Sequence, residues 1–410
     1  MPRLLRRLPL LLAALAGLSP PVMAAPVRAG LVLDRAVVLM RHGVRVPLDG
    51  EVPADTRSAA PWPRWPLPES RVTPHGAQAM TLLGAFDRRR WVQAGLVPAT
   101  GCPRGGTVRI HSNTAIRTIQ SGEAYAAGLA PGCPIMVDHL AEDQADPLFE
   151  PLRAGATAFD ARAAVGAIDR YTGGMAALAD RHRPDIRLLD RVLDCGDPRG
   201  CTGGGAPALR PSADGRGIDL SGPIRSTSGI AQVLLLQYAE GMPASQVGWG
   251  RADAATIARL GRLHAALFDV FTRSPYMAAH QASALGDHML GALTRKDGPA
   301  LDLLVGHDTN VTALGAALGV DLAAPGYALN DVAPGGAILL ERYRDPRSGA
   351  LYVRAAYQAQ PLDALRTLSP EVTVTPLTVK GCATLCPLPR FERLLRARLA
   401  PLVARPAPGR

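Results

Sequence analysis

The sequence contains few aromatic residues and almost no lysine. Phenylalanine, tryptophan and tyrosine make up 4% of the 410 residues, and Lys296 and Lys380 are the only lysines. The formal net charge of +10 comes from arginines that are scattered along the chain rather than gathered into one basic stretch. Nucleic-acid-binding surfaces need clustered cations and, for single strands, aromatic rings that stack on bases. The composition predicts no nucleic-acid partner and indicates a modest attraction for anionic substrates.

Long apolar runs are absent after the N-terminus. Three arginines between positions 3 and 7 precede a short apolar stretch, Leu8 to Leu18, and Val22-Met23-Ala24 resembles a cleavage signal. This order is typical of a secretory signal peptide, so we expect residues 1–24 to be removed. The alternative is a membrane anchor, but the stretch is shorter than the ~20 residues that span a bilayer. The sequence predicts a periplasmic or secreted protein with no membrane contact after cleavage.

The six cysteines fall into three couples that are local in sequence. In an oxidising compartment we expect them to form disulfides, and local pairing is the simplest of the connectivities that six cysteines allow. The alternative is a zinc site, but the second and third couples have no nearby histidine and lie far apart in sequence. We therefore expect no metal site. The couples are Cys102 with Cys133, Cys195 with Cys201, and Cys382 with Cys386.

Apolar periodicity divides the chain into three parts. Strand-like runs and helical patterns alternate near both ends, whereas residues 160–284 are helical and carry no strand signal, with a glycine-rich loop at 196–217. An insertion into one α/β domain explains this order simply. We predict an α/β fold with an open, mostly parallel sheet flanked by helices (28–155 and 285–405) and an inserted all-α domain (156–284). The expected strands are 31–40, 107–110, 301–305, 337–341 and 352–357; the expected helices near the N-terminus run from Thr73 towards Trp91 and over 114–128.

The stretch MRHGVRVP, residues 40–47, ends the first apolar strand. A strand that runs into a glycine turn places the next side chains at the carboxyl edge of the sheet, where open α/β folds bind ligands. Arg41 and Arg45 carry forked donors that fit phosphate or carboxylate oxygens. Neighbouring guanidinium groups disfavour an imidazolium, so we expect His42 to be neutral and able to attack phosphorus. A lone Arg-His-Gly is as well explained by a solvated turn; the full string favours a phosphate site.

The stretch LDLLVGHDTN, residues 301–310, repeats this design with an apolar strand, a glycine and then His307-Asp308. His307 can donate a hydrogen bond to a phosphate oxygen, and Asp308 can act as a general acid towards a leaving alcohol. That role requires Asp308 to be protonated with substrate bound, which predicts activity favoured at acid pH. The alternative is that Asp308 caps the helix expected from Thr309 to Leu318.

Together, the two motifs resemble those of the histidine acid phosphatase family, in its bacterial periplasmic phytase and glucose-1-phosphatase branch. The resemblance implies the histidine phosphatase fold, an α/β domain with an inserted α domain. Further similar stretches run through most of the mature chain: VTPHG (72–76), SGEAYAAGLAPGC (121–133), YAEGMP (238–243), GWGR (248–251), APGGAILLERYR (333–344) and the C-terminal KGC…CPLPRF (380–391).

The resemblance also implies roles for individual residues. His42 would be the nucleophile that forms a phosphohistidine, and Asp308 the proton donor. Arg41, Arg45, Arg117 and His307 would bind the substrate phosphate. Arg117 is assigned through the resemblance alone, since an isolated arginine near a helix start is usually a solvated charge.

The chain departs from the bacterial phytases beside the first motif and in the helical segment. Leu48 and Asp49 stand where those relatives usually have threonine and lysine, and Gln232 stands where they usually have a glutamate that faces the pocket. These differences question a preference for phytate, but they leave the phosphate-cleaving residues intact. We expect the remaining histidines to be structural or solvated: His75, His111, His139, His182, His264, His280 and His288.

The sequence therefore predicts an exported, monomeric histidine acid phosphatase that cleaves phytate or sugar phosphates and needs no cofactor. One alternative is a phosphotransferase like phosphoglycerate mutase, which shares the Arg-His-Gly chemistry; the leader, the cysteine couples and the helical insertion disfavour it. The other is an exported non-catalytic anion- or phosphate-binding protein. The presence of both His42 and Asp308 disfavours that alternative.

Overall fold

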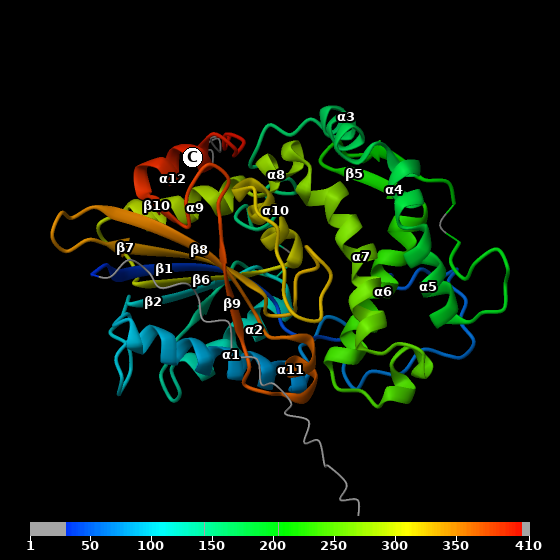
Figure 1. Ribbon diagram of the computed structural model, residues 1–410, viewed down its shortest axis with the longest axis horizontal. Helices are drawn as coiled ribbons and strands as arrows, with labels where there is room; N and C mark the ends of the chain where they lie inside the picture. The colour runs from blue at the N-terminus through cyan, green and yellow to red at the C-terminus, as the bar shows by residue number, and fades with distance from the viewer. Residues whose placement is uncertain (1–29, 143, 204, 404–410) are drawn as a thin grey trace, which may run out of the picture.

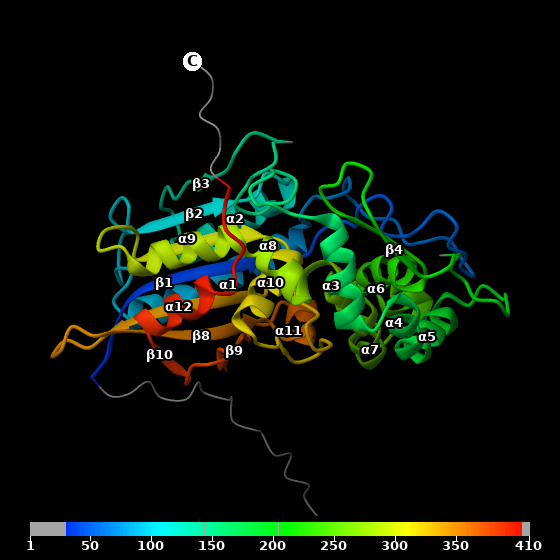
Figure 2. The same ribbon diagram turned by 90° about the horizontal axis from the view of Figure 1, so that it is seen from above.

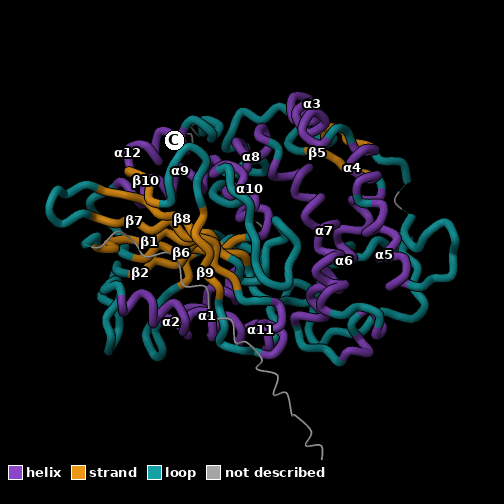
Figure 3. The backbone as a smooth tube through the Cα atoms, in the orientation of Figure 1, coloured by secondary structure: helices purple, strands orange, loops and turns teal. Residues whose placement is uncertain are grey.

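A computed structural model describes residues 30–142, 144–203 and 205–403 (Figure 1). The expected signal peptide, residues 1–24, lies outside the described residues. In the described part, a layer of strands covered by helices lies beside a second region made mainly of helices (Figures 1 and 3). No described helix combines the length and the apolar character needed to cross a membrane.

The central sheet has eight strands in the order β10-β8-β7-β1-β6-β2-β3, with β9 paired to β8. β1, β6, β2 and β3 are parallel neighbours, whereas β7, β8, β9 and β10 join through antiparallel pairs. Because β8 is two antiparallel pairings away from β1, it runs in the same direction as the parallel group. The predicted α/β class is confirmed. The strands are β1 (Val32–Arg41), β2 (Val108–Ser112), β3 (Val137–Asp138), β6 (Leu301–Gly306), β7 (Ala337–Arg344), β8 (Leu351–Ala359), β9 (Thr373–Leu377) and β10 (Leu385–Pro387).

Helices cover both faces of this sheet (Figures 1 and 2). α1 (Pro74–Gln93) and α2 (Ile116–Leu129) lie on one face, and α9 (Ser283–Thr294), α10 (Asp308–Leu318) and α12 (Leu388–Arg396) lie on the other. The side chains of β1 alternate between the two cores: Ala36, Val38 and Met40 belong to one cluster, and Val37 and Leu39 to the other. A strand buried on both faces reads as a continuous apolar run, which is why it was recognisable in the sequence.

Helix α1 begins at the Thr73-Pro74 pair that the sequence predicted as its start. The hydroxyl of Thr73 accepts a hydrogen bond from the backbone N–H of Gly76 at 2.9 Å, and Pro74 occupies the first turn, where a missing N–H costs nothing. The predicted cap and helix are therefore confirmed. Since the loop before Thr73 pairs with the residues after His42, through an isolated bridge between Arg45 and Val72, this helix start also anchors the first motif.

The second region is mainly helical, but it is not free of strands. β4 (Ala208–Pro211) lies in the glycine-rich segment predicted as a loop, and it forms an antiparallel hairpin with β5 (Ile218–Ser221), which directly follows that segment. The absence of strands predicted for 160–284 was therefore wrong. Each strand has only four residues, too few to give a clear period of two, and its apolar side chains Leu209, Ile218 and Leu220 pack on the neighbouring helices. The helices are α3 (Ala161–Thr172), α4 (Met175–Arg181), α5 (Arg183–Leu193), α6 (Pro223–Ala239), α7 (Ala254–Phe268), a π-helical turn (Asp269–Arg273) and α8 (Pro275–Gln281); short 3₁₀ turns span Ala244–Gln246 and Gly248–Gly250, and α11 (Leu362–Thr367) lies near the sheet.

One apolar cluster extends from the sheet into the helical region. It contains Leu39 and Leu304 of the sheet as well as Leu234 of α6 and Leu263 of α7. The two regions thus share a continuous core, and the proposed boundaries at 155/156 and 284/285 stay a prediction. The three cysteine couples form disulfides as expected, with Cα–Cα distances of 5.5, 5.7 and 5.4 Å.

Candidate active site

Two neighbouring strands end side by side at the candidate site. β1 and β6 are parallel, and their register pairs Arg41 with Gly306, so His42 and His307 are the next residues of adjacent strands. The centroids of the two imidazole rings lie 5.7 Å apart. The sheet therefore brings together the two motifs, which are separated by more than half the chain.

His42 is buried, and one of its ring nitrogens is committed to the backbone. Its Nδ1 lies 2.9 Å from the carbonyl oxygen of Gly43, and because a carbonyl oxygen only accepts, Nδ1 carries the proton. Burial, followed by the charges of Arg117 and Arg41, lowers the pKa of His42 well below its usual value. The ring is therefore neutral, with the free lone pair on Nε2.

Arg41 and Asp308 form an ion pair next to His42. Arg41 is fully buried; its Nη2 lies 3.1 Å from Oδ2 of Asp308, and its Nη1 donates to the carbonyl oxygen of Val332. Burial favours the neutral form of Asp308, but Arg41, followed by His264 and His307, outweighs burial and holds the pKa of Asp308 below its usual range. Asp308 is thus ionised in this substrate-free structure. His307, rather than Asp308, is the N-cap residue of α10, although the Asp308 carboxylate also accepts the N–H of Thr309 at 2.8 Å.

Arg45 is held by a carboxylate that the sequence did not single out. Its Nη1 lies 3.0 Å from Oε2 of Glu51, its Nη2 contacts the other oxygen, and Nη1 also donates to the carbonyl oxygen of Val46. Glu51 additionally accepts the N–H of Leu48 at 2.9 Å. The loop after the first motif therefore folds back on itself and fixes the guanidinium at the wall of the cavity.

Arg117, in the first turn of α2, reaches the same place. It donates through Nη1 to the hydroxyl of Ser70 at 3.0 Å, and its Nη2 lies 3.4 Å from Nδ1 of His307. The other nitrogen of His307, Nε2, lies 3.0 Å from Oδ1 of Asn113. Because a guanidinium only donates, Nδ1 of His307 is the acceptor and Nε2 carries the proton.

The surroundings of His307 and Arg117 lower the pKa of both side chains. Burial, followed by Arg117, lowers the pKa of His307 to about 3, so this ring is neutral. Burial, followed by Arg45, lowers the pKa of Arg117 to about 10, which leaves the guanidinium charged at any acid or neutral pH. The inner end of the site thus holds three guanidinium groups and two neutral imidazoles.

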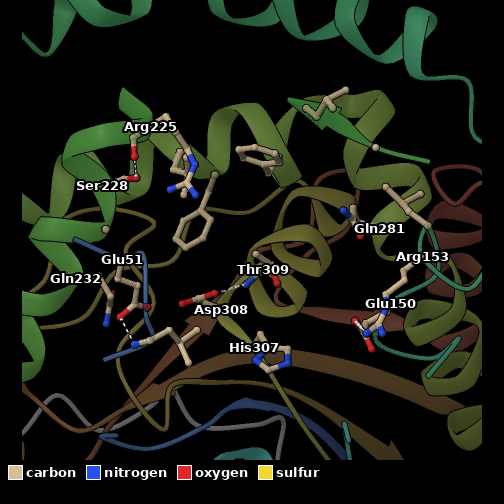
Figure 4. Close-up of a pocket in the computed structure, with 18 of the residues that line it drawn as sticks. Glu51, Glu150, Arg153, Arg225, Ser228, Gln232, Gln281, His307, Asp308 and Thr309 are labelled. Carbon is tan, nitrogen blue, oxygen red and sulfur yellow. Dashed lines mark hydrogen bonds and ion pairs between the residues drawn. The ribbon is translucent and has the colours of Figure 1, made fainter. Parts of the chain in front are cut away.

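These residues open into a cavity of about 990 Å³ between the sheet and the helical region. Leu48, Asp49 and Gln232, the three predicted pocket residues, all line it. Gln232 is 3% exposed, and neither the oxygen nor the nitrogen of its amide has a hydrogen-bond partner among the described residues. Figure 4 shows Gln232 and Arg225 on one side of the cavity, Glu150 and Arg153 on the other, and Asp308 and His307 between them.

The outer wall of the cavity is electrically balanced. It carries three arginines and three carboxylates: Arg153, Arg216, Arg225, Asp49, Glu150 and Asp214. Arg153 lies 3.0 Å from Glu150, and the backbone N–H of Arg216 donates to Asp214. No hydrogen bond or ion pair to another described residue engages the guanidinium of Arg225. The three carboxylates of this wall therefore offset the positive charge of its three arginines.

Several residues of the site were not predicted. Glu51, Asn113, Ser70 and Asp331 carry no motif of their own, and only the fold brings them to the site. His264, which we expected to be structural or solvated, lines the cavity, with its Nε2 3.9 Å from Asp308. Its spacing on α7 resembles that of any helical core residue. Among the described residues, no group of three or more His, Cys, Asp or Glu side chains is arranged to hold a metal ion.

Comparisons with known proteins point the same way as the geometry. The family described as "Histidine phosphatase superfamily (branch 2)" matches residues 32–167. The phytase AppA of Escherichia coli is 32% identical over 425 aligned positions, which cover 95% of this chain and 97% of that protein. A glucose-1-phosphatase of Salmonella typhimurium is 28% identical and covers 94% of this chain and 98% of its own length. The ligand-free structure of Hafnia alvei phytase superposes with a TM-score of 0.84 at 30% identity, over 92% of this chain and 99% of that one.

Proposed function

This chain belongs to branch 2 of the histidine phosphatase superfamily and is an acid phosphatase that hydrolyses phosphate monoesters; from that premise, we propose that His42 is its nucleophile and Asp308 its proton donor. The observation that carries the proposal is the hydrogen bond from Nδ1 of His42 to the carbonyl oxygen of Gly43. It fixes the tautomer in which Nε2 has a free lone pair, as nucleophilic attack on phosphorus requires.

The phosphate group binds among Arg41, Arg45 and Arg117. Their guanidinium groups supply charge-assisted hydrogen bonds to the oxygens, where negative charge accumulates during phosphoryl transfer. Each is held by a partner that limits its motion: Asp308, Glu51 and Ser70 respectively. His307 orients Arg117 through its acceptor Nδ1, and it donates to the phosphate only in a form that carries a proton on Nδ1.

The reaction proceeds in two displacements. Nε2 of His42 attacks phosphorus while the bond from phosphorus to the ester oxygen breaks, and Asp308 gives its proton to that oxygen as the alcohol leaves. Water then attacks the phosphohistidine, the resulting carboxylate of Asp308 takes a proton from the water, and the P–N electron pair returns to Nε2. The products are an alcohol and inorganic phosphate.

The substrate is proposed from the cavity wall. The similar proteins include a phytase and a glucose-1-phosphatase, and Leu48, Asp49 and Gln232 place an apolar, an acidic and a neutral side chain beside the phosphate-binding groups. Together with the balanced outer wall, these residues favour a small sugar phosphate over a hexaphosphate. The comparison of kcat/KM at pH ~5 for glucose 1-phosphate and for phytate tests this preference.

We further propose that the mature protein is exported and acts as a monomer in the periplasm or outside the cell. The N-terminal pattern of residues 1–24 supports export, and so do three disulfides, which persist in oxidising compartments. Detection of mature protein beginning at Ala25 in the exported fraction, with the mass of one chain in solution, is the expected result.

A His42→Ala variant tests the catalytic proposal. We expect kcat for 4-nitrophenyl phosphate to fall on the order of 10⁴-fold or more, with phosphate binding retained through the arginines. Full activity in this variant would refute His42 as the nucleophile.

The non-catalytic alternative has a different test. It would be favoured if the wild-type protein bound phosphate but hydrolysed neither phytate, glucose 1-phosphate nor an aryl phosphate. Neither this alternative nor the mutase-like one has support from the relatives reported above.

A further inference from the structure

Two groups lie behind Asp308 that the proposed reaction does not use. His264 of α7 and Asp331 of the loop before β7 are 7% and 3% exposed. Nδ1 of His264 lies 2.8 Å from Oδ1 of Asp331, and its Nε2 lies 3.9 Å from Oδ2 of Asp308. The imidazole therefore sits between two carboxylates, one outside the reaction and one at its centre.

The orientation of this imidazole is set by its neighbours. Asp331 accepts the Nδ1 proton, so the nitrogen that faces Asp308 is Nε2. The ring of Phe268, one turn later on α7, packs at 4.5 Å between centroids. Gly261, one turn earlier, leaves room for Asp331, because a Cβ there would fall 2.3 Å from Oδ2 of that carboxylate. That Oδ2 is buried, and no residue in the described part of the chain forms a hydrogen bond with it.

The other charged and titratable groups around the pair are few. Arg41 and His307 face Asp308 from the two strand ends, and Tyr327 and Tyr357 lie near Asp331. Burial, the largest cause, raises the pKa of Tyr327 and of Tyr357, so both are neutral phenols at acid and neutral pH. Asp331 and Asp308 are therefore the two carboxyl groups that face the nitrogens of His264.

The arrangement meets a need of the reaction. A general acid must carry a proton, yet the contact with Arg41 favours the ionised form of Asp308 in the free enzyme. We propose that His264, oriented by Asp331, is a positioning residue that holds the proton which Asp308 passes to the leaving group. The inference rests on the proposed role of Asp308 as proton donor.

The proton balance closes within the site. In the proposed sequence of steps, Nε2 of His264 supplies the proton while Asp308 starts as a carboxylate paired with Arg41. When a phosphate dianion engages Arg41, the ion pair between Arg41 and Asp308 weakens, and the carboxylate can close the 3.9 Å that separates its Oδ2 from Nε2 of His264 to hydrogen-bond distance. The proton then passes from Nε2 to Oδ2, leaving a neutral imidazole that still donates to Asp331. Asp308 gives this proton to the ester oxygen, regains one from the attacking water, and returns it to His264 when phosphate leaves.

The test compares leaving groups, because only a poor leaving group needs the proton. His264→Asn keeps a donor for Asp331 but has no group that can hold the proton. We expect its kcat/KM to fall about tenfold or more for glycerol 2-phosphate, and less than about threefold for 4-nitrophenyl phosphate, whose leaving group is already stable as an anion. The basic limb of its pH profile should move to lower pH. Asp331→Asn should act in the same direction, and it replaces His264→Asn if that variant fails to fold.

His280→Asn is the matched control. His280 is 8% exposed, and its Nδ1 also has a side-chain partner, the hydroxyl of Thr157 at 3.0 Å, but it is not among the residues that line the cavity. This variant should change neither the leaving-group dependence nor the pH profile.

Two results would overturn the inference. If kcat/KM falls equally for both substrates in His264→Asn and Asp331→Asn, with an unchanged pH profile, the pair has a purely structural role. If kcat/KM falls for neither substrate, the pair has no role in the reaction. Asp308→Asn separates this failure from that of the proposed function. If Asp308→Asn shows the leaving-group dependence and His264→Asn does not, the inference alone fails; if Asp308→Asn lacks it, the proton-donor assignment fails as well.

Discussion

At the inner end of the cavity, Arg41, Arg45 and His42 are at most 4% exposed, and each side chain has a fixed partner, whereas at the outer end Arg216 and Arg225 are exposed. The inner groups come from the ends of two adjacent parallel strands and from the first turn of α2. The two outer arginines come from the turn between β4 and β5 and from the first turn of α6. One cavity therefore joins a rigid end, which we propose binds the phosphate, to a less constrained end, which we propose meets the leaving group.

This contrast indicates how the two tasks are divided. Phosphoryl transfer needs preorganised charge, and buried guanidinium groups with fixed partners provide it without reorganisation during the reaction. Substrate choice depends on contacts to the leaving group, and exposed side chains can change without disturbing the core. Substitutions at the inner end should therefore reduce activity on every substrate, and those at the outer end should change the ratio between substrates.

The largest difference is expected between two arginines that line the same cavity. Arg45→Ala removes a phosphate ligand and leaves Glu51 unpaired beside the phosphate, so kcat/KM should fall about 10³-fold for every ester. Arg225→Ala should change kcat/KM for 4-nitrophenyl phosphate less than about twofold, since its guanidinium supports no other described residue. The measurement is kcat/KM of both variants on 4-nitrophenyl phosphate. Similar losses of kcat/KM in the two variants would contradict the difference between the inner and the outer end.

A smaller loss is expected where the outer helix supports the inner end. A methyl group at Gly229 of α6 would lie 2.1 Å from the carbonyl oxygen of Glu51, so Gly229→Ala should displace the loop that clamps Arg45. We expect kcat/KM to fall about tenfold to 100-fold. Gly166→Ala in α3 is the control, because its nearest atom would be a flexible guanidinium nitrogen at 3.5 Å; it should raise stability by about 0.5–1 kcal/mol and leave kinetics unchanged. Equal kinetics in the two variants would contradict the link between α6 and Arg45.

The outer end should shift specificity by a modest factor. Arg225, on α6, is an outer arginine whose guanidinium has no polar partner among the described residues, so it is available to a second phosphate. Arg225→Ala should lower kcat/KM for phytate about fivefold relative to glucose 1-phosphate. An unchanged ratio would mean that substrates do not reach this part of the wall.

The last expected effect concerns the stability of the folded chain against pH rather than its activity. The folded pKa of His307 is about 3, below that of an unfolded histidine, so the unfolded chain binds more protons between these two values. Stability should therefore fall as the pH drops below about 6.5, by up to about 1.4 kcal/mol per pH unit from this group. Thermal melts of wild type and His307→Gln between pH 4 and 7 should show a shallower slope in the variant. Parallel slopes would contradict a neutral, buried His307.

The contrast between the two ends also explains what the sequence could predict. His42 and Asp308 follow long buried strands, so apolar runs and glycine turns marked their positions, and the resemblance supplied Arg117. The hairpin β4–β5 was missed because four-residue strands give no clear alternation. His264 and Asp331 were missed because one is spaced like a core residue and the other lies in a loop, and only the packing of α7 against the loop before β7 joins them.

The central claim is that phosphate is transferred to Nε2 of His42. Wild-type enzyme mixed with substrate and quenched in base, where phosphohistidine survives, can be digested and analysed by mass spectrometry and phosphorus NMR. We predict phosphate on the peptide that contains His42, attached to Nε2 because Nδ1 donates a hydrogen bond to the carbonyl oxygen of Gly43. Phosphate on Nδ1, on another residue, or on no residue during turnover would contradict the account.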